Sequence, residues 1–383
     1  MSDTKPDGET DFTRMVNDVN ALLRSKYKNK IIGGRPGTRP QFELYHAAPS
    51  LCSHKVRTVL AEKQVAYASH DMDIMPAGKF IPENYRPEYV RMRLQGAPNA
   101  RLVDGYTGES SVSVQGFDPC VVPTLVDHEK ERVVIDSKTI CEYVDAEADS
   151  GATLIPTELA SEIAAQETLI DQAPHVAALY GAHPDDDFRP MGLRKNIAGV
   201  HARKIRVLNA LIDQIGDSDP SVRAAYEAKI KKEDAASEFV IDADGMRETH
   251  RQMGAHVDAL EAQLLSHSED WVCGDIYTIA DIMWTCSMWR LQWLGFGRLW
   301  SAYTGRDRLR TYLDKAFQRP AFRSAVIQWP GAHAPSPHVA EHRGFGAVSG
   351  FAVHMIRSTQ WGQVIWGDPK IKLPPAEPIP AHQ

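Results

Sequence analysis

One cysteine of this chain lies where a protein could use it as a nucleophile. Cys52 belongs to the run Ser50-Leu51-Cys52-Ser53-His54-Lys55-Val56-Arg57, which opens an amphipathic helix. A helix N-terminus and the nearby cations Lys55 and Arg57 favour the thiolate, which is the reactive form of cysteine. Ser50 or Ser53 could donate a hydrogen bond to that thiolate, and the sequence does not say which. The alternative is a structural cysteine, because free cysteines are among the most buried residues.

Two further motifs could bind a peptide-like ligand beside this thiol. Val122-Pro123 begins a short strand, and a cis bond before Pro123 would leave the main chain of Val122 free to pair with an extended peptide. Asp136-Ser137 begins a helix, where the hydroxyl, the N–H groups and the dipole suit a carboxylate. Each motif also has an ordinary structural explanation. Pro123 could simply open an edge strand, and Asp136 with Ser137 could simply cap a helix.

The elements around these motifs predict a thioredoxin-like α/β domain. Apolar alternation marks strands, and three- and four-residue apolar spacing marks helices. The expected strands or extended stretches cover 42–46, 65–71, 123–126 and 132–135, helices begin at Cys52 and Asp136, and 76–118 is expected to be irregular. Strand, helix, strand, hairpin and helix is the order of a thioredoxin-like unit.

After residue 148 the pattern becomes helical, which predicts an all-α C-terminal domain. Apolar residues recur at helical spacing through 159–182, 193–216, 219–235, 246–267, 278–300 and 306–317. The expected organisation is an N-terminal extension (1–41, with a short helix at 12–25), a thioredoxin-like domain (42–148), a linker (149–158), an all-helical substrate domain (159–330) and a C-terminal extension (331–383).

Composition limits the classes of function. The net charge of −7 over 383 residues argues against nucleic acid as the main partner. The five cysteines are widely scattered, which indicates neither a disulfide framework nor a metal site. The N-terminus is polar and acidic, unlike a signal peptide, and the most apolar stretch, 276–300, is interrupted by charged residues. We therefore expect a cytoplasmic protein with no metal and no membrane partner.

Taken together, the three motifs and the helical region that follows them resemble the glutathione transferase superfamily over about 42–330. A further likeness is Gly274-Asp275-Ile276-Tyr277-Thr278-Ile279-Ala280-Asp281, which is similar to the internal capping box of that superfamily, with Thr278 as N-cap answered by Asp281. The resemblance implies glutathione as co-substrate. It places glutathione on Val122, Pro123, Asp136 and Ser137.

Within the superfamily, the pattern around Cys52 is similar to that of maleylacetoacetate isomerases and of the glutathione-dependent reductive dehalogenases of chlorinated hydroquinones. The runs Gly116-Phe117-Asp118-Pro119 and Ile327-Gln328-Trp329-Pro330-Gly331 also resemble the dehalogenases. This likeness implies reductive dehalogenation of a halogenated hydroquinone. Glutathione would first replace the halogen, and Cys52 would then take the glutathione as a mixed disulfide that a second glutathione resolves.

The residues leave the substrate pocket and the exact reaction open. His175, Tyr180 and Arg189 are candidates for an aromatic substrate pocket, where they could stabilise a phenolate oxygen, but capping or surface roles are equally open. The same scaffold could instead isomerise a diene acid or cleave an aryl ether. A non-catalytic binding module is a further alternative, although the intact motifs argue against it. The resemblance also allows a homodimer.

Overall fold

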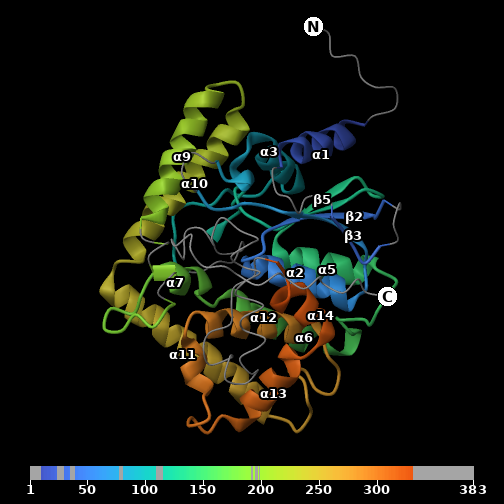
Figure 1. Ribbon diagram of the computed structural model, residues 1–383, viewed down its shortest axis with the longest axis vertical. Coiled ribbons are helices and arrows are strands. Elements are labelled where there is room, and N and C mark those ends of the chain that lie inside the picture. The colour runs from blue at the N-terminus through green and yellow to red at the C-terminus, as the bar shows by residue number, and fades with distance from the viewer. Residues whose placement is uncertain are drawn as a thin grey trace, which may run out of the picture.

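The computed structural model describes residues 10–23, 30–34, 39–76, 81–108, 115–190, 193–194, 197 and 199–330. The predicted C-terminal extension, 331–383, lies outside the described residues. A mixed sheet with helices on both faces forms the upper part of the molecule in Figure 1, and a group of helices forms the lower part. None of the described helices is long and apolar enough to cross a membrane.

The sheet has five strands in the order β1-β3-β2-β4-β5. The strands are β1 (Lys30–Ile32), β2 (Phe42–His46), β3 (Tyr67–Asp71), β4 (Thr124–Asp127) and β5 (Arg132–Ile135). Strands β2 and β3 are parallel, and the other neighbours are antiparallel. Every residue of β2 is buried, as expected for a central strand covered on both faces.

Two pairs of helices cover this sheet. Helices α2 (Leu51–Glu62) and α5 (Ser137–Glu147) pack together below it in Figure 1, and α1 (Asp11–Leu22) and α3 (Pro87–Gly96) lie above it. This arrangement confirms the predicted thioredoxin-like α/β fold.

Two parts of this unit differ from the sequence-based expectation. Helix α3 lies within 76–118, which was expected to be irregular. Proline at its first position fits a helix start, and its buried Tyr89, Val90 and Met92 give it an apolar face despite the polar residues between them. The segment expected to be an extension supplies α1 and the edge strand β1 to this unit.

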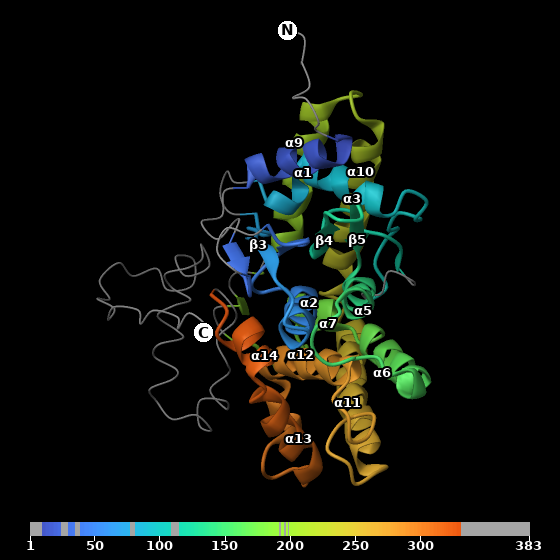
Figure 2. The ribbon, with the colours of Figure 1, turned by 90° about the vertical axis from the view of Figure 1, so that its right-hand side faces the viewer.

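The second unit is helical, as predicted. Its elements are α6 (Ala160–Asp171), α7 (His175–Tyr180), α9 (Val200–Ile215), α10 (Pro220–Phe239), α11 (Ala243–Leu265), α12 (Ile279–Trp293), α13 (Asp307–Phe317) and α14 (Pro320–Phe322). Short 3-10 or π turns occur at Glu83–Tyr85, Thr157–Leu159, Phe296–Trp300 and Arg323–Ile327. Helices α9 and α10 form an antiparallel pair, the α9–α10 hairpin, that rises beside the sheet and contacts α3 (Figures 1 and 2).

Helix α12 joins the two units, because it packs against both α2 and α6 and all of its residues are buried. The predicted capping box starts it: Thr278 is the N-cap, and the Asp281 carboxylate accepts from the main-chain N–H of Thr278 at 2.9 Å. The same carboxylate accepts from Val272 N–H at 2.9 Å. Burial raises the pKa of Asp281 to about 6. These contacts give Asp281 a structural role, as the sequence indicated.

Candidate active site

A cavity of about 300 Å³ lies where the sheet unit meets the helical unit. Its lining includes Cys52 and Ser50 from the start of α2, the Val122-Pro123 loop, Asp136 and Ser137 from the start of α5, and His175 and Tyr180 from α7. All three sequence motifs therefore face one cavity. The helical unit adds Trp293 and Arg290 from α12 and several side chains from the α9–α10 hairpin.

The thiol of Cys52 is half-buried in the first turn of α2. Ser50 is the N-cap of that helix, and its hydroxyl oxygen accepts from Ser53 N–H at 3.3 Å. Ser53 is fully buried, and its own hydroxyl oxygen accepts from Ala47 N–H at 3.2 Å. Of the two candidate serines, Ser50 lines the cavity with Cys52, and Ser53 holds the loop that precedes the helix.

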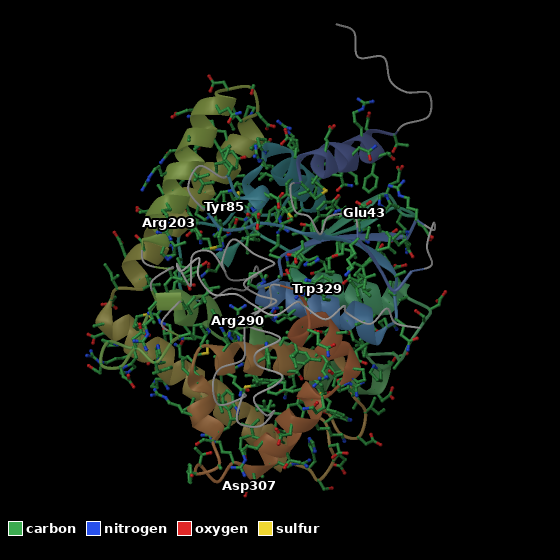
Figure 3. All side chains as sticks on the ribbon, viewed as in Figure 1. Glu43, Tyr85, Arg203, Arg290, Asp307 and Trp329 are labelled. Carbon is green, nitrogen blue, oxygen red and sulfur yellow. The ribbon has the colours of Figure 1, made fainter. Side chains whose placement is uncertain are left out.

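Two cations, Lys55 on α2 and Arg290 on α12, interact with the charge of this thiol. Although burial opposes it, the charges of Asp171 and Cys52 raise the pKa of Lys55, whose Nζ lies 3.6 Å from the Asp171 carboxylate. Burial lowers the pKa of Arg290 to about 10, and the charge of Cys52 partly opposes that shift. Figure 3 marks Arg290 in the middle of the molecule, at the junction of the two units. Lys55 and Arg290 therefore both interact electrostatically with Cys52.

Arg57, the other cation of the motif, has a different place. It is fully buried, and its guanidinium donates to the main-chain oxygens of Ala47 at 3.2 Å and Ala325 at 2.8 Å. Its carbon also lies 4.5 Å from the centre of the Trp329 ring. Arg57 therefore ties the end of β2 to the last described residues.

The Val122-Pro123 peptide bond is cis, which is the first of the two explanations that the sequence left open for this proline. The loop is held from α3: Arg93 Nη1 donates to the Pro123 main-chain oxygen at 2.6 Å, and Tyr89 Oη donates to that of Val121 at 2.9 Å. The helix missed from the sequence thus fixes the segment where an extended ligand would pair. Val122 and Pro123 both line the cavity.

Asp136 is the N-cap of α5, at a positive φ of 69°. Its carboxylate accepts from the N–H groups of Lys138 and Thr139, both at 3.1 Å. Ser137, the first helical residue, is buried and also lines the cavity. The end of a helix dipole, a hydroxyl and a carboxylate therefore meet at one wall, which suits a ligand that carries both a carboxylate and an ammonium group.

The three candidates for the substrate pocket do not all meet. His175 is buried, its Nε2 lies 3.0 Å from Ser287 Oγ, and its Nδ1 is buried with no partner among the described groups. Tyr180 lines the cavity with it. Arg189 is not among the lining residues, because its guanidinium donates to the Asp187 carboxylate at 2.8 Å.

An ionic cluster, defined as His201, Lys204, Lys229, Lys232, Glu233 and Asp118, forms another wall of the cavity. Lys232 is partly exposed, and the other members are buried. Glu233 lies 2.7 Å from His201 Nδ1, 3.1 Å from Lys204 Nζ and 3.0 Å from Lys229 Nζ. Asp118 lies 2.7 Å from Lys229 Nζ and 3.0 Å from Lys232 Nζ. Except for Asp118, the cluster comes from the α9–α10 hairpin.

Sequence reasoning missed this cluster and Arg290. The available signal for Arg290 was an arginine inside the most apolar stretch, since a charged side chain in a buried helix needs a specific partner. The cluster had a weaker signal, because lysines and glutamates at helical spacing usually mark a solvated face.

The fold and this site define a member of the glutathione transferase family. The family model described as the glutathione S-transferase N-terminal domain matches residues 49–147. Over 302 residues the chain is 42% identical to a 2,5-dichlorohydroquinone reductive dechlorinase of Sphingobium indicum, covering 78% of this chain and 86% of that protein. The chain belongs to the glutathione transferase family.

Two further similarities accompany this match. A tetrachloro-p-hydroquinone reductive dehalogenase of Sphingobium chlorophenolicum is 26% identical over 296 residues, covering 76% of this chain and 99% of that protein. Among solved structures, the beta-etherase of Sphingobium sp. strain SYK-6 aligns with a TM-score of 0.49 and 18% identity, covering 74% of this chain and 98% of that one.

Proposed function

We propose that this protein is a glutathione-dependent reductive dehalogenase of halogenated hydroquinones. The observation that carries the proposal is the 42% identity to a 2,5-dichlorohydroquinone reductive dechlorinase over most of both chains. The cavity supports that chemistry, because half-buried Cys52, the cation Arg290 and the loop with the cis Val122-Pro123 bond all line it. Its volume, about 300 Å³, is at the lower end of the range for small-molecule sites.

In the proposed reaction, two glutathione molecules supply two electrons. The sulfur of the first glutathione forms a bond to the ring carbon of the quinoid tautomer, and halide leaves with the carbon–halogen electron pair. The Cys52 thiolate then attacks that glutathione sulfur, and the carbon–sulfur electron pair returns to the ring carbon, which takes a proton. The second glutathione attacks the Cys52–glutathione disulfide, releasing oxidised glutathione and free Cys52.

The residues divide this work by position. Val122 would pair with the main chain of glutathione, with Pro123 fixing the loop. Ser137 and the start of α5 would bind a glutathione carboxylate, and Asp136 would attract its ammonium group. Ser50 is the better placed of the two serines to assist the Cys52 thiolate, because it faces the cavity and Ser53 does not. Arg290 and Lys55 would favour that thiolate electrostatically.

The proposal extends to the compartment, the metal content and the assembly of the protein. All five cysteines are free thiols, which fits a reducing compartment, and we propose that the protein works in the cytoplasm. We also propose that it works without a metal and assembles as a homodimer, and size determination in solution tests the assembly directly. The helical substrate domain over 159–330, with the linker over 149–158 before it, is part of this proposal.

The test is to trap the reaction between its two stages. Cys52→Ser should still allow glutathione to displace halide but should stall before reduction, because a serine hydroxyl does not attack sulfur at neutral pH. A glutathionyl-hydroquinone should then accumulate and be detected by mass spectrometry. Normal formation of dehalogenated product by Cys52→Ser would rule out the proposed mechanism.

Cys120→Ser is the matched control. Cys120 also lines the cavity, but burial raises the pKa of its thiol, which keeps it protonated. This variant should release dehalogenated product and accumulate no glutathionyl-hydroquinone. If glutathionyl-hydroquinone accumulates in both variants, its accumulation does not depend on the loss of Cys52 as a nucleophile.

A further inference from the structure

His201 on the α9–α10 hairpin lines the cavity. One of its ring nitrogens contacts a carboxylate, and the other has no hydrogen-bond partner among the described groups. His201 Nδ1 lies 2.7 Å from the Glu233 carboxylate, and the residue is only 7% exposed. Its Nε2 is buried and has no hydrogen-bond partner among the described groups. A carboxylate at Nδ1 fixes the tautomer in which Nε2 is a proton acceptor. A carboxylate-held imidazole of this kind has the arrangement of a general base.

The same wall carries more positive than negative charge. In the ionic cluster, the three ammonium groups of Lys204, Lys229 and Lys232 share the two carboxylates of Asp118 and Glu233. Although burial raises it, the pKa of Glu233 is held well below its usual range by Lys204 and Lys229. Both carboxylates are thus kept ionised and one positive charge remains uncompensated. Such a wall attracts an anionic oxygen.

This wall is also close to the thiol. Cys52, Tyr180 and Arg290 all line the cavity, and the charges of Cys52 and Tyr180 both act on Arg290. Lys204 Nζ lies 3.4 Å from Tyr180 Oη and 4.7 Å from the centre of its ring. The His201 ring lies 5.0 Å from the Tyr180 ring. A ligand in the cavity can therefore meet the thiol and the cluster together.

We propose that His201, oriented by Glu233, removes the proton from a ring hydroxyl of the substrate and that Lys204 binds the resulting oxyanion. This proposal rests on the proposed function and names the form in which the aromatic ring is bound. The O–H bond breaks, the proton passes to His201 Nε2, and the electron pair stays on the phenolate oxygen. No electrons are gained or lost in this step. The phenolate charge then moves into the ring, which is what formation of the quinoid tautomer requires.

Several charged and titratable groups surround His201. The Glu233 carboxylate on α10 lies at its Nδ1, and the same carboxylate binds the ammonium groups of Lys204 on α9 and Lys229 on α10. Tyr180 on α7 contacts the ring face, and Tyr106, from the loop before the sheet hairpin, also borders the cavity. The pH dependence of the step therefore belongs to the whole cluster rather than to His201 alone.

The experiment uses 4-nitrophenol, whose phenolate is yellow and whose phenol is not. It is titrated from acidic to basic pH while bound to the full chain, and absorbance reports its ionisation without any dehalogenation. In the wild-type protein its apparent pKa should fall by about 1–3 units below that in solution, the range for a group beside an opposite charge. Lys204→Met and His201→Asn should each remove most of that shift, because the asparagine amide keeps a donor for Glu233 but cannot accept the proton.

Lys231→Met is the matched control, since Lys231 is on the same hairpin but its side chain is 70% exposed and it does not line the cavity. It should keep the wild-type shift. An unshifted pKa in the wild-type protein, or a full shift in Lys204→Met or His201→Asn, would overturn the proposal. Circular dichroism and glutathione calorimetry identify any variant that fails to fold. If one variant fails, the pKa shift in the wild-type protein and in the other variant tests the proposal.

A second readout separates this proposal from the proposed function. If the protein releases halide from chlorohydroquinones, kcat/KM of His201→Asn should fall by about 10²–10⁴, the usual contribution of general acid–base catalysis, and its acidic limb should disappear. Undiminished halide release by that variant would reject His201 as the base and leave the dehalogenase assignment standing. A shifted nitrophenol pKa with no halide release would support the phenolate site and reject the dehalogenase.

Discussion

The guanidinium of Arg290 donates a hydrogen bond to the main-chain oxygen of Pro49, which is three residues before Cys52. Helix α12 of the helical unit is thereby fastened to the loop that sets the start of α2. The charges of Cys52 and Arg290 also interact, so this arginine acts on the thiol as well as on the loop. One arginine therefore links the junction of the two units to the reactivity of the thiol.

Replacing Arg290 by methionine should lower the reactivity of Cys52. The change removes a buried positive charge close to the sulfur, and we expect alkylation by iodoacetamide at neutral pH to slow by about tenfold, which corresponds to roughly 1.4 kcal/mol. Quenched-time mass spectrometry of the Cys52 peptide measures that rate. The other cysteines are buried, so Cys52 is the site expected to react.

Arg298→Met is the control for this experiment. Arg298 also carries a guanidinium beside α12, but it pairs with Asp186 at 3.2 Å on the surface and does not line the cavity. Its alkylation rate should match that of the wild-type protein. Equal rates for Arg290→Met and the wild type would mean that Arg290 has only a structural role at Pro49.

Ser137→Ala should weaken glutathione binding by about 1–3 kcal/mol, the cost of leaving a charged partner without its hydrogen bond. Asp136 caps α5 through its own carboxylate, so the helix should keep its start in this variant. Isothermal titration calorimetry with glutathione gives the affinity. Unchanged affinity would place the glutathione carboxylate elsewhere in the cavity.

The ionic cluster should make the stability of the protein fall in acid. Although burial raises both values, the lysines hold the pKa of Asp118 and of Glu233 below the usual range in the folded state. The unfolded chain then binds more protons than the folded chain at low pH, so the free energy of unfolding decreases as pH falls. The loss should begin near the ordinary values of these groups, 4.5 for Glu233 and 3.8 for Asp118.

Lys229→Met tests this dependence, because Lys229 pairs with both carboxylates. At pH 7 the variant should lose about 3–5 kcal/mol of unfolding free energy, the usual cost of removing one partner of a buried ion pair. Urea unfolding from pH 7 to pH 3 should also show a flatter decline than for the wild type. Parallel curves for the two proteins would show that the cluster does not set the acid sensitivity.

The sequence predicted the parts of the site that depend on local pattern. Alternation gave β2, the cap residues gave the start of α5, and Thr278 with Asp281 gave the capping box. Each of these is decided within a few neighbouring residues. The sequence raised a cis bond at Val122-Pro123 as one of two explanations for that proline, and the structure shows the cis form.

The missed parts depend on contacts between residues far apart in the chain. Arg290 lies 241 residues from Pro49, and Lys229 lies 111 residues from Asp118. No local spacing relates such pairs. Helix α3 was missed because its buried Arg93 looks like a surface residue in sequence, whereas it donates to the Pro123 carbonyl. Arg189 was a candidate for the substrate pocket but does not line the cavity. Its guanidinium is held by the Asp187 carboxylate, two residues away.

The balance of products tests the central claim most directly. Replacing a carbon–halogen bond by a carbon–hydrogen bond requires two electrons, and two glutathione thiols supply them by becoming one disulfide. The protein is incubated with glutathione and 2,5-dichlorohydroquinone, and chloride and oxidised glutathione are assayed in the same sample. We predict one oxidised glutathione for each chloride released. Chloride without oxidised glutathione would make the protein a conjugating transferase. The absence of both products would contradict dehalogenation altogether.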